Sequence, residues 1–210
     1  MTIIMYDDAD WCSIWESHMK VSREQVALNR ERIVETAARL FRQKGYDGIG
    51  VVDLMKSAGL THGGFYGHFA SKEDLLAEAT AHAFKKSVGR WRERAAATLN
   101  APETAMASIG DSYLSVRHRD GPESGCSITS LGPDIARLGP KVRQALTEGA
   151  KGQIAVLEEL VPGEDQAAKR KQALTTYAAM VGAIVLARAV DDEEMSLEIL
   201  ETVRASLPGT

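Results

Sequence analysis

The sequence predicts an all-α protein in which a small N-terminal head is joined to a larger helical body. Apolar residues recur at helical spacing over most of the 210 residues, and the alternating pattern of a strand is almost absent. The helical pattern is interrupted, at intervals typical of helix ends, by glycine and proline pairs at 121–122, 139–140 and 162–163. We expect about nine helices, divided between a head at residues 20–70 and a body at residues 71–210.

The first 19 residues differ from the rest of the chain. They carry four acidic residues and no Lys or Arg, and they lack the basic-then-apolar order of a secretory signal. We expect residues 1–19 to be a disordered extension, or a misassigned start that precedes Met19. Two cysteines, Cys12 and Cys126, are too few for a disulfide scaffold. A reducing cytoplasm is therefore the expected location.

The head begins with a helix at about 23–44. Ser22 and Gln25 form the pattern of a capping box, in which side chains bond the free backbone donors at a helix start. Gly45 predicts the end, because glycine accepts the left-handed conformation that closes helices. Between these signals lies one apolar stripe at helical spacing: Ile33, Ala37, Leu40 and Phe41.

Two short helices follow. One is expected at about 51–57, and the tight turn Ala58-Gly59-Leu60 comes after it. Thr61 is expected to cap the other, at about 62–67. Two short helices joined by a turn that contains glycine make a helix-turn-helix. Ser71, with an acidic residue three positions later, then begins a long fourth helix.

The body is predicted to hold five further helices, at 102–118, 125–138, 140–161, 165–189 and 192–207. The second half of 165–189 is apolar almost all round but is too interrupted by polar residues to read as a membrane span. Such a helix needs two covered faces, and a second copy of the chain can supply one. We expect a homodimer with interface residues Ala178, Ala179, Gly182, Ala183, Leu197 and Leu200. The alternative is that the last two helices only close the core of the monomer.

The distribution of charge is more informative than its total. The net charge of −4 argues weakly against nucleic acid, yet residues 20–90 hold twelve Lys or Arg against eight Asp or Glu. A local basic excess is what a DNA-binding segment requires. A solvated charged helix face would give the same count.

The third helix contains two adjacent glycines, Gly63 and Gly64. Each costs a helix roughly 1 kcal/mol relative to alanine. Bare backbone at these positions would let the helix approach a DNA groove closely. Thr61 and His62 lie at the N-terminal end, which in a recognition helix usually reaches base edges.

The residues that follow offer contacts to the DNA backbone. Tyr66, His68 and Lys72 can reach phosphates, which fix register, while base contacts give sequence choice. His68 has an alternative role, packing and hydrogen-bonding within the head. Phe65 and Phe69 are expected in the core of the head rather than on DNA.

From the first helix to the start of the fourth, the sequence resembles the TetR (tetracycline-repressor-like) family of bacterial regulators. The resemblance covers about residues 25–76. Its specific segments are Leu40-Phe41-Arg42-Gln43-Lys44-Gly45-Tyr46, Ala58-Gly59-Leu60, Phe65-Tyr66-Gly67-His68-Phe69 and Ser71-Lys72-Glu73-Asp74-Leu75. In that family the first three helices bind DNA, the last two form a four-helix dimer interface, and the middle helices enclose a small-molecule pocket.

The resemblance assigns roles by position. It implies base or phosphate contacts at Thr61, His62, Gly63, Gly64 and Tyr66, and phosphate-side contacts at His68 and Lys72. Arg23 and Arg30 are weaker candidates on the first helix, with ordinary solvated charges as the alternative. One departure stands at 49–51, where Ile-Gly-Val replaces the Ser or Thr with which many members start the second helix. That phosphate contact is then made by the backbone alone, or is lost.

The effector is not readable from the sequence. Pocket candidates are large apolar residues of the body, each of which could equally be plain core: Trp91, Met106, Tyr113, Ile128, Leu131 and Leu157. Cys126 is expected at a helix start, where free N–H groups can lower the pKa of a thiol. Arg117, His118 and Arg119 lie near it in sequence. Cys126 is therefore a candidate sensor of electrophiles or oxidants, and the alternative is a small, partly buried residue with no role.

The function these signals predict is a sequence-specific transcriptional regulator. We expect a homodimeric repressor that binds double-stranded operator DNA and is released by a small-molecule or thiol-reactive effector, with no membrane partner. No nucleophile, metal-ligand or phosphate-loop motif is recognised, so we expect no enzyme activity, cofactor or metal. The alternatives are a helical interaction module and a small enzyme without DNA binding.

Overall fold

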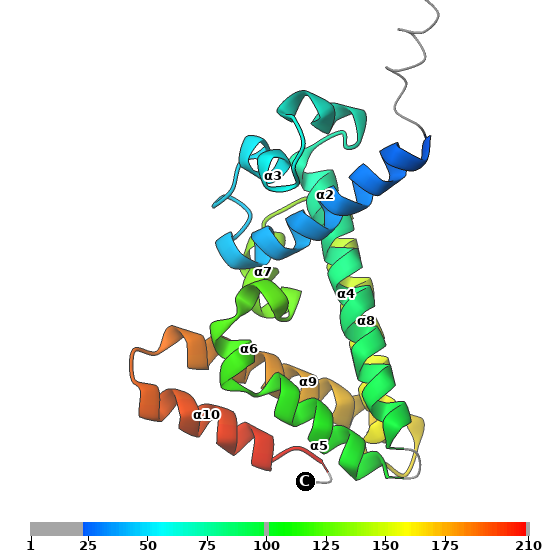
Figure 1. Cartoon of the computed structure of the whole chain (residues 1–210). Coiled ribbons are helices and arrows are strands. Elements are labelled where there is room, and N and C mark those ends of the chain that lie inside the picture. The colour runs from blue at the N-terminus through cyan, green and yellow to red at the C-terminus, as the bar shows by residue number, and fades with distance from the viewer. Residues whose placement is uncertain (1–22, 99–100, 209–210) are drawn as a thin grey trace, which may run out of the picture.

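The computed structural model describes residues 23–98 and 101–208, and every regular element among them is helical. The elements are α2 (Arg23–Lys44), α3 (Val51–Ser57), the 3₁₀ helix η1 (His62–Gly67), α4 (Lys72–Ala97), α5 (Pro102–Tyr113), α6 (Val116–Asp120), the 3₁₀ helix η2 (Pro122–Ser124), α7 (Ser127–Ile135), α8 (Pro140–Leu160), α9 (Gln166–Ala189) and α10 (Glu193–Ala205). The predicted all-α fold class is confirmed. Figure 1 shows a head that contains α2 and α3, connected to the body by the helices α4 and α8, which run side by side.

Some of the expected elements differ from the structure. The helix expected at 102–118 is two helices, α5 and α6, because the chain leaves helical geometry at Leu114, whose φ and ψ are −91° and 54°. The helix expected at 125–138 is shorter, and Cys126 is its N-cap. Thr61 is the N-cap residue of η1, as expected, but its side chain makes no capping hydrogen bond. Residues 1–19 and the Ser22 cap lie outside the described residues.

The core of the head is built from α2, α3, η1, the start of α4 and part of α7. Its largest fully buried side chains include Phe41, Leu54, Phe65 and Leu75. Gly45 and Gly59 close α2 and α3 with φ of +76° and +71°, values that favour glycine. The contribution of α7 was not foreseen: Leu131 and Ile135 pack into this core.

The body has its own core, in which α4, α5, α8, α9 and α10 meet. A Cβ atom at Gly149 of α8 would lie 2.1 Å from the Phe84 ring of α4, so glycine permits the close packing of these two helices. Gln153 is fully buried between them. Its side chain donates to Ser87 Oγ at 3.0 Å and accepts from Tyr177 Oη at 2.6 Å, which satisfies its polar atoms inside the core.

The apolar helix α9 is only partly covered. By length and composition alone it could cross a membrane, and 39% of its most apolar 18-residue window is buried within the chain. Tyr177, Met180 and Ile184 face the body core, whereas Leu174, Val185 and Leu186 are exposed. The chain itself therefore covers one face of α9 and leaves another open.

Candidate nucleic-acid interface and effector cavity

The segment Thr61–His68 lies at the surface of the head, anchored by two buried rings. Phe65 and Phe69 are 1% and 3% exposed and their ring centroids lie 5.7 Å apart, as expected for core residues. Thr61, His62 and both adjacent glycines are exposed, and Tyr66 is 69% exposed. Tyr66 stands edge-on to the rings of His62 and Phe65. The segment thus offers its polar side chains to a partner while the phenylalanines fix its position.

The two glycines are not required by packing inside the head. A Cβ at Gly63 would meet nothing within 4 Å, and one at Gly64 would make only ordinary contacts, the nearest at 3.7 Å to Met55. Among the described glycines only Gly45 and Gly59 have positive φ, so φ is negative at both Gly63 and Gly64. The bare backbone of Gly63 therefore faces open space, where an external surface can approach it.

The candidates for phosphate contact are placed differently from one another. Lys72 holds its ammonium group 4.3 Å from the centre of the Tyr46 ring, and burial lowers its pKa. His68 packs beside Phe69, and its buried Nδ1 has no hydrogen-bond partner among the described residues. Arg23 is exposed at the first turn of α2. Of these three candidates and Tyr66, only Arg23 and Tyr66 are exposed.

Arg30 has partners inside the protein. Its guanidinium forms a two-bond ion pair with Glu78 of α4, both contacts at 2.6 Å, and stacks 4.7 Å from the centre of the Phe69 ring. Hydrogen bonding to Glu78 raises the pKa of Arg30. These contacts use the flat face and the terminal nitrogens of Arg30 to join α2 to α4.

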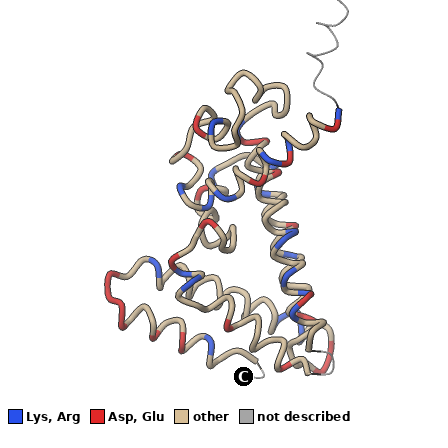
Figure 2. Tube along the Cα trace, viewed as in Figure 1, with Lys and Arg blue, Asp and Glu red and all other residues tan. Residues whose placement is uncertain are grey.

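The basic excess of residues 20–90 is not gathered on the recognition segment. Thr61–His68 contains no Lys or Arg, and Lys85, Lys86 and Arg90 lie near the middle of α4. Figure 2 shows Lys and Arg segments along the long helices between the head and the body. Lys86 is paired with Glu35 at 2.5 Å. Part of the excess of Lys and Arg in residues 20–90 therefore belongs to the body. It does not indicate a basic patch at the recognition segment.

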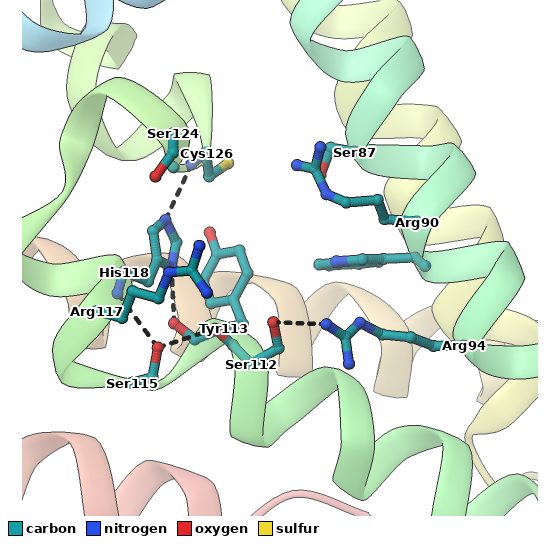
Figure 3. Close-up of a pocket in the computed structure, with 12 residues that line it drawn as sticks. Ser87, Arg90, Arg94, Ser112, Tyr113, Ser115, Arg117, His118, Ser124 and Cys126 are labelled. Atoms are coloured by element: carbon teal, nitrogen blue, oxygen red, sulfur yellow. Dashed lines mark hydrogen bonds between the residues drawn. The ribbon is translucent and has the colours of Figure 1, made fainter.

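A cavity of about 330 Å³ lies where α4 faces the α5–α6 junction and the start of α7. Figure 3 shows Arg90 and Arg94 projecting from α4 toward Tyr113, Arg117 and His118 on the opposite side. The residues that line it are Ser87, Arg90, Trp91, Arg94, Ser112, Tyr113, Ser115, Arg117, His118, Ser124, Gly125 and Cys126.

Two of the six expected pocket residues, Trp91 and Tyr113, line this cavity. Met106 and Leu157 are fully buried in the body core, Ile128 packs against that core, and Leu131 lies in the core of the head. Sequence reasoning noted Arg117 and His118 beside Cys126 but missed Arg90, Arg94 and the serines, because it looked for apolar pocket residues. The signal that could have found them is the four-residue spacing of Arg90 and Arg94 around Trp91, which places all three near one face of a helix.

Cys126 lies at the inner wall of the cavity, 5% exposed. Its backbone N–H donates to His118 Nε2 at 2.9 Å, and His118 Nδ1 lies 2.7 Å from the backbone oxygen of Tyr113. Burial lowers the pKa of His118 to about 4, so the ring is neutral, with its proton on Nδ1. The Sγ atom is 4.0 Å from Gln153 Oε1.

Of the three basic residues near Cys126 in sequence, only Arg117 brings a positive charge to the cavity. His118 is neutral, and Arg119 points elsewhere, pairing with Asp120 and Glu193 at 2.7 and 3.0 Å. Burial raises the pKa of Tyr113 and of Tyr177, so both phenols near the thiol stay protonated.

The expected dimer residues fall on two sides of the last helices. Ala178, Ala179 and Leu197 are exposed and Gly182 is half-buried, whereas Ala183 and Leu200 pack in the body core. The open face also carries large apolar residues that were not listed as candidates: Leu174, Val185, Leu186 and Met195.

Comparison with known proteins places this geometry among bacterial regulators. Residues 33–79 match the model of the bacterial regulatory proteins of the tetR family. The HTH-type transcriptional repressor NemR of Escherichia coli K12 is 28% identical over 134 residues, which are 62% of this chain and 65% of NemR. The repressor KstR2 of Mycobacterium tuberculosis H37Rv is 30% identical over 94 residues, 45% of this chain and 47% of that protein. The alignments thus span less than two thirds of these relatives.

The fold similarity extends further along the chain. The crystal structure of reduced E. coli NemR superposes with a TM-score of 0.73 and 26% identity, covering 85% of this chain and 94% of that one. A TetR-family regulator from Cytophaga hutchinsonii gives the same TM-score at 19% identity, covering 91% and 99%. These matches include the body as well as the head.

Proposed function

The chain belongs to the TetR family of bacterial regulatory proteins, and from this premise we propose that it is a cytoplasmic, homodimeric repressor. It binds double-stranded operator DNA through the segment Thr61–His68, and an effector in the cavity beside Cys126 releases it.

The observation that carries the proposal is the exposed recognition segment. Tyr66, His62 and Thr61 project from a 3₁₀ turn whose position is fixed by the buried rings of Phe65 and Phe69, while the backbone at Gly63 faces open space. A surface that glycine leaves without side chains at Gly63, and that presents hydroxyl and imidazole groups, suits the major groove. Base edges there offer matching donors and acceptors.

A dimer is supported by the open face of α9 and α10. Large exposed apolar side chains beside small residues such as Ala178 and Ala179 allow two helices to pack closely. A second copy is the occupant that suits an operator protein, because a two-fold dimer reads two half-sites and one head reads few bases.

Two connections can carry a change from the cavity to the head. The first is α4, a single 26-residue helix that holds Arg90 and Arg94 at the cavity and Glu78 at the head. The second is Arg42 of α2, which donates from Nε and Nη2 to the backbone oxygen of Glu123, at 3.1 and 2.5 Å. Ser124, Gly125 and Cys126 follow directly and line the cavity. An effector that binds one arrangement of these elements more tightly shifts the head equilibrium by that difference in affinity.

A thiol-reactive effector is the finer form of the proposal. An electrophile with an activated double bond would add to the thiolate of Cys126, forming an S–C bond while the neighbouring carbon takes a proton. The added group would occupy the cavity beside the segment that follows Glu123, whose backbone oxygen accepts the hydrogen bonds of Arg42. The similarity to a repressor whose structure was determined in a reduced form supports this choice.

The experiment that tests the function is selection of bound fragments from a random pool of double-stranded DNA by the purified, effector-free protein. Enrichment of a two-fold symmetric sequence is the expected result. A helical interaction module or a small enzyme without DNA binding would enrich none.

A further inference from the structure

The walls of the cavity beside Cys126 carry positive charge without matching acids. Arg90, Arg94 and Arg117 line it, and no Asp or Glu is among the lining residues. None of the three arginines forms an ion pair within the described part of the chain. Arg94 instead donates to the hydroxyl oxygens of Ser108 and Ser112, at 3.3 and 3.1 Å.

A fourth guanidinium stands behind the wall. Arg188 of α9 donates to the backbone oxygens of Arg119 and His118, at 2.7 and 2.6 Å, and to the hydroxyls of Thr129 and Ser130. All of these acceptors are neutral, so its charge is not cancelled by them. Of the nearby acids, Asp120 is already paired with Arg119, and neither it nor Glu123 lines the cavity.

Two aromatic rings are among the residues that line the cavity. Trp91 and Tyr113 line it at 6% and 5% exposure, with ring centroids 5.9 Å apart and an interplanar angle of 72°. The hydroxyl of Tyr113 is itself buried and lies beside the Cys126 thiol, so Tyr113 contributes its ring to the lining of the cavity.

We propose that this cavity also takes a reversibly bound effector beside the thiol-reactive one: a small organic anion, with a flat ring system against Trp91 and Tyr113 and a carboxylate or phosphate held by Arg90, Arg94 and Arg117. This inference rests on the proposed function and specifies the ligand of its cavity. Guanidinium groups bind both kinds of anion through paired, charge-assisted hydrogen bonds. The volume of about 330 Å³ is at the lower end of small-molecule sites and suits a ligand of one or two rings.

The test is calorimetric titration of the purified full-length chain, without DNA, with three probes of one shape. The probes are 2-naphthoate, 2-naphthyl phosphate and the neutral 2-naphthamide. We expect saturable binding of at least one anion, tighter than the amide by about tenfold to a hundredfold, which is the value of a charge-assisted hydrogen bond in a shielded site. The preferred anion then assigns the head group.

Matched variants test which arginines bind the anion. Arg94→Gln and Arg117→Gln are each expected to weaken anion binding about tenfold or more and to leave amide binding unchanged. Arg92→Gln is the control, because Arg92 lies between Arg90 and Arg94 in sequence, is exposed, and does not line this cavity. Circular dichroism establishes that each variant is folded.

The inference is overturned if the amide binds as tightly as the anions, if Arg92→Gln loses as much affinity as the other two variants, or if no anion binds at millimolar concentration. A bound anion that leaves the affinity for duplex DNA unchanged would also overturn its role as effector. Failure of the effector-free protein to bind any duplex would instead contradict the proposed function. That outcome is distinguishable, because the calorimetric titration is carried out without DNA.

Discussion

Arg30 and Glu78 hold the first helix of the head against α4 through two parallel contacts of 2.6 Å between guanidinium and carboxylate. Arg30 also covers the ring of Phe69, which anchors the recognition segment. A residue that sequence alone offered as a contact to the DNA backbone is therefore positioned to fix the orientation of the head on the helix that reaches the cavity.

Arg30→Gln and Glu78→Gln are expected to destabilise the protein by similar, non-additive amounts. Both side chains are about a third or more exposed, 41% and 34%, so solvent screening keeps the value of the pair at about 0.5–1 kcal/mol. Denaturation of the two variants and the double variant measures the coupling. The salt dependence of DNA binding should keep its slope in Arg30→Gln, and a slope lower by about one would show that Arg30 contacts phosphate after all.

Leu186→Glu is expected to convert the dimer to a monomer. Leu186 is 56% exposed on the open face of α9, and a carboxylate there would be buried without a partner when two copies meet. Leu28→Glu is the control, because Leu28 is 50% exposed on α2. Light scattering after gel filtration gives the mass of each variant. If Leu186→Glu stays dimeric, the interface lies elsewhere.

Cys126→Ser is expected to make operator release insensitive to thiol reagents. In the wild type, N-ethylmaleimide should alkylate Sγ and release DNA, because the added group would fill the cavity beside the backbone that bonds Arg42. Cys12→Ser should behave as the wild type. Fluorescence anisotropy of a labelled operator follows release, and equal release from the wild type and Cys126→Ser would remove Cys126 from the mechanism.

The stability of the protein should fall as the pH drops from about 6.5 toward 4. Burial lowers the pKa of His118 to about 4, with smaller effects in the same direction from Arg188 and Arg90, so the unfolded chain binds a proton that the native state does not. The stabilisation is complete above the unfolded pKa of about 6.5, and its loss amounts to roughly 2–3 kcal/mol by pH 4.

The control for this pH dependence is His118→Gln, whose amide does not titrate. Around the ring stand Arg188 of α9, Arg90 of α4, and the protonated Tyr113. Chemical denaturation at a series of pH values should show a shallower loss of stability in the variant. Identical pH profiles for wild type and variant would mean that His118 is not the group responsible.

The head could be predicted closely because its signals are local. Gly45 and Gly59 end helices at the expected positions with positive φ, and the third helix spans the expected residues 62–67. That this helix is 3₁₀ rather than α could not be foreseen, because the capping and glycine signals do not separate the two types. The absence of a capping bond from Thr61 is likewise a matter of side-chain rotation.

The cavity could not be predicted because it depends on how distant segments meet. Arg90 and Arg117 are brought together by the crossing of α4 and the α5–α6 junction, and the break at Leu114 that creates this junction has no strong sequence signal. Leu131 was expected at the pocket and lies instead in the core of the head. Which core a helix joins is decided by long-range packing, and apolar residues alone do not report it.

The most direct test of the central claim is the duplex affinity of the wild type and of Gly63→Ala at low ionic strength. A methyl group at Gly63 meets nothing within 4 Å in the free protein, so the fold should be unaffected, but it would stand between the recognition segment and the groove. The account predicts tight duplex binding by the wild type that weakens steeply with salt. Gly63→Ala should lose about tenfold or more in duplex affinity, whereas the control Gly89→Ala on α4 should keep the wild-type affinity. Equal duplex affinity for the wild type and Gly63→Ala, or no duplex binding by either, would contradict it.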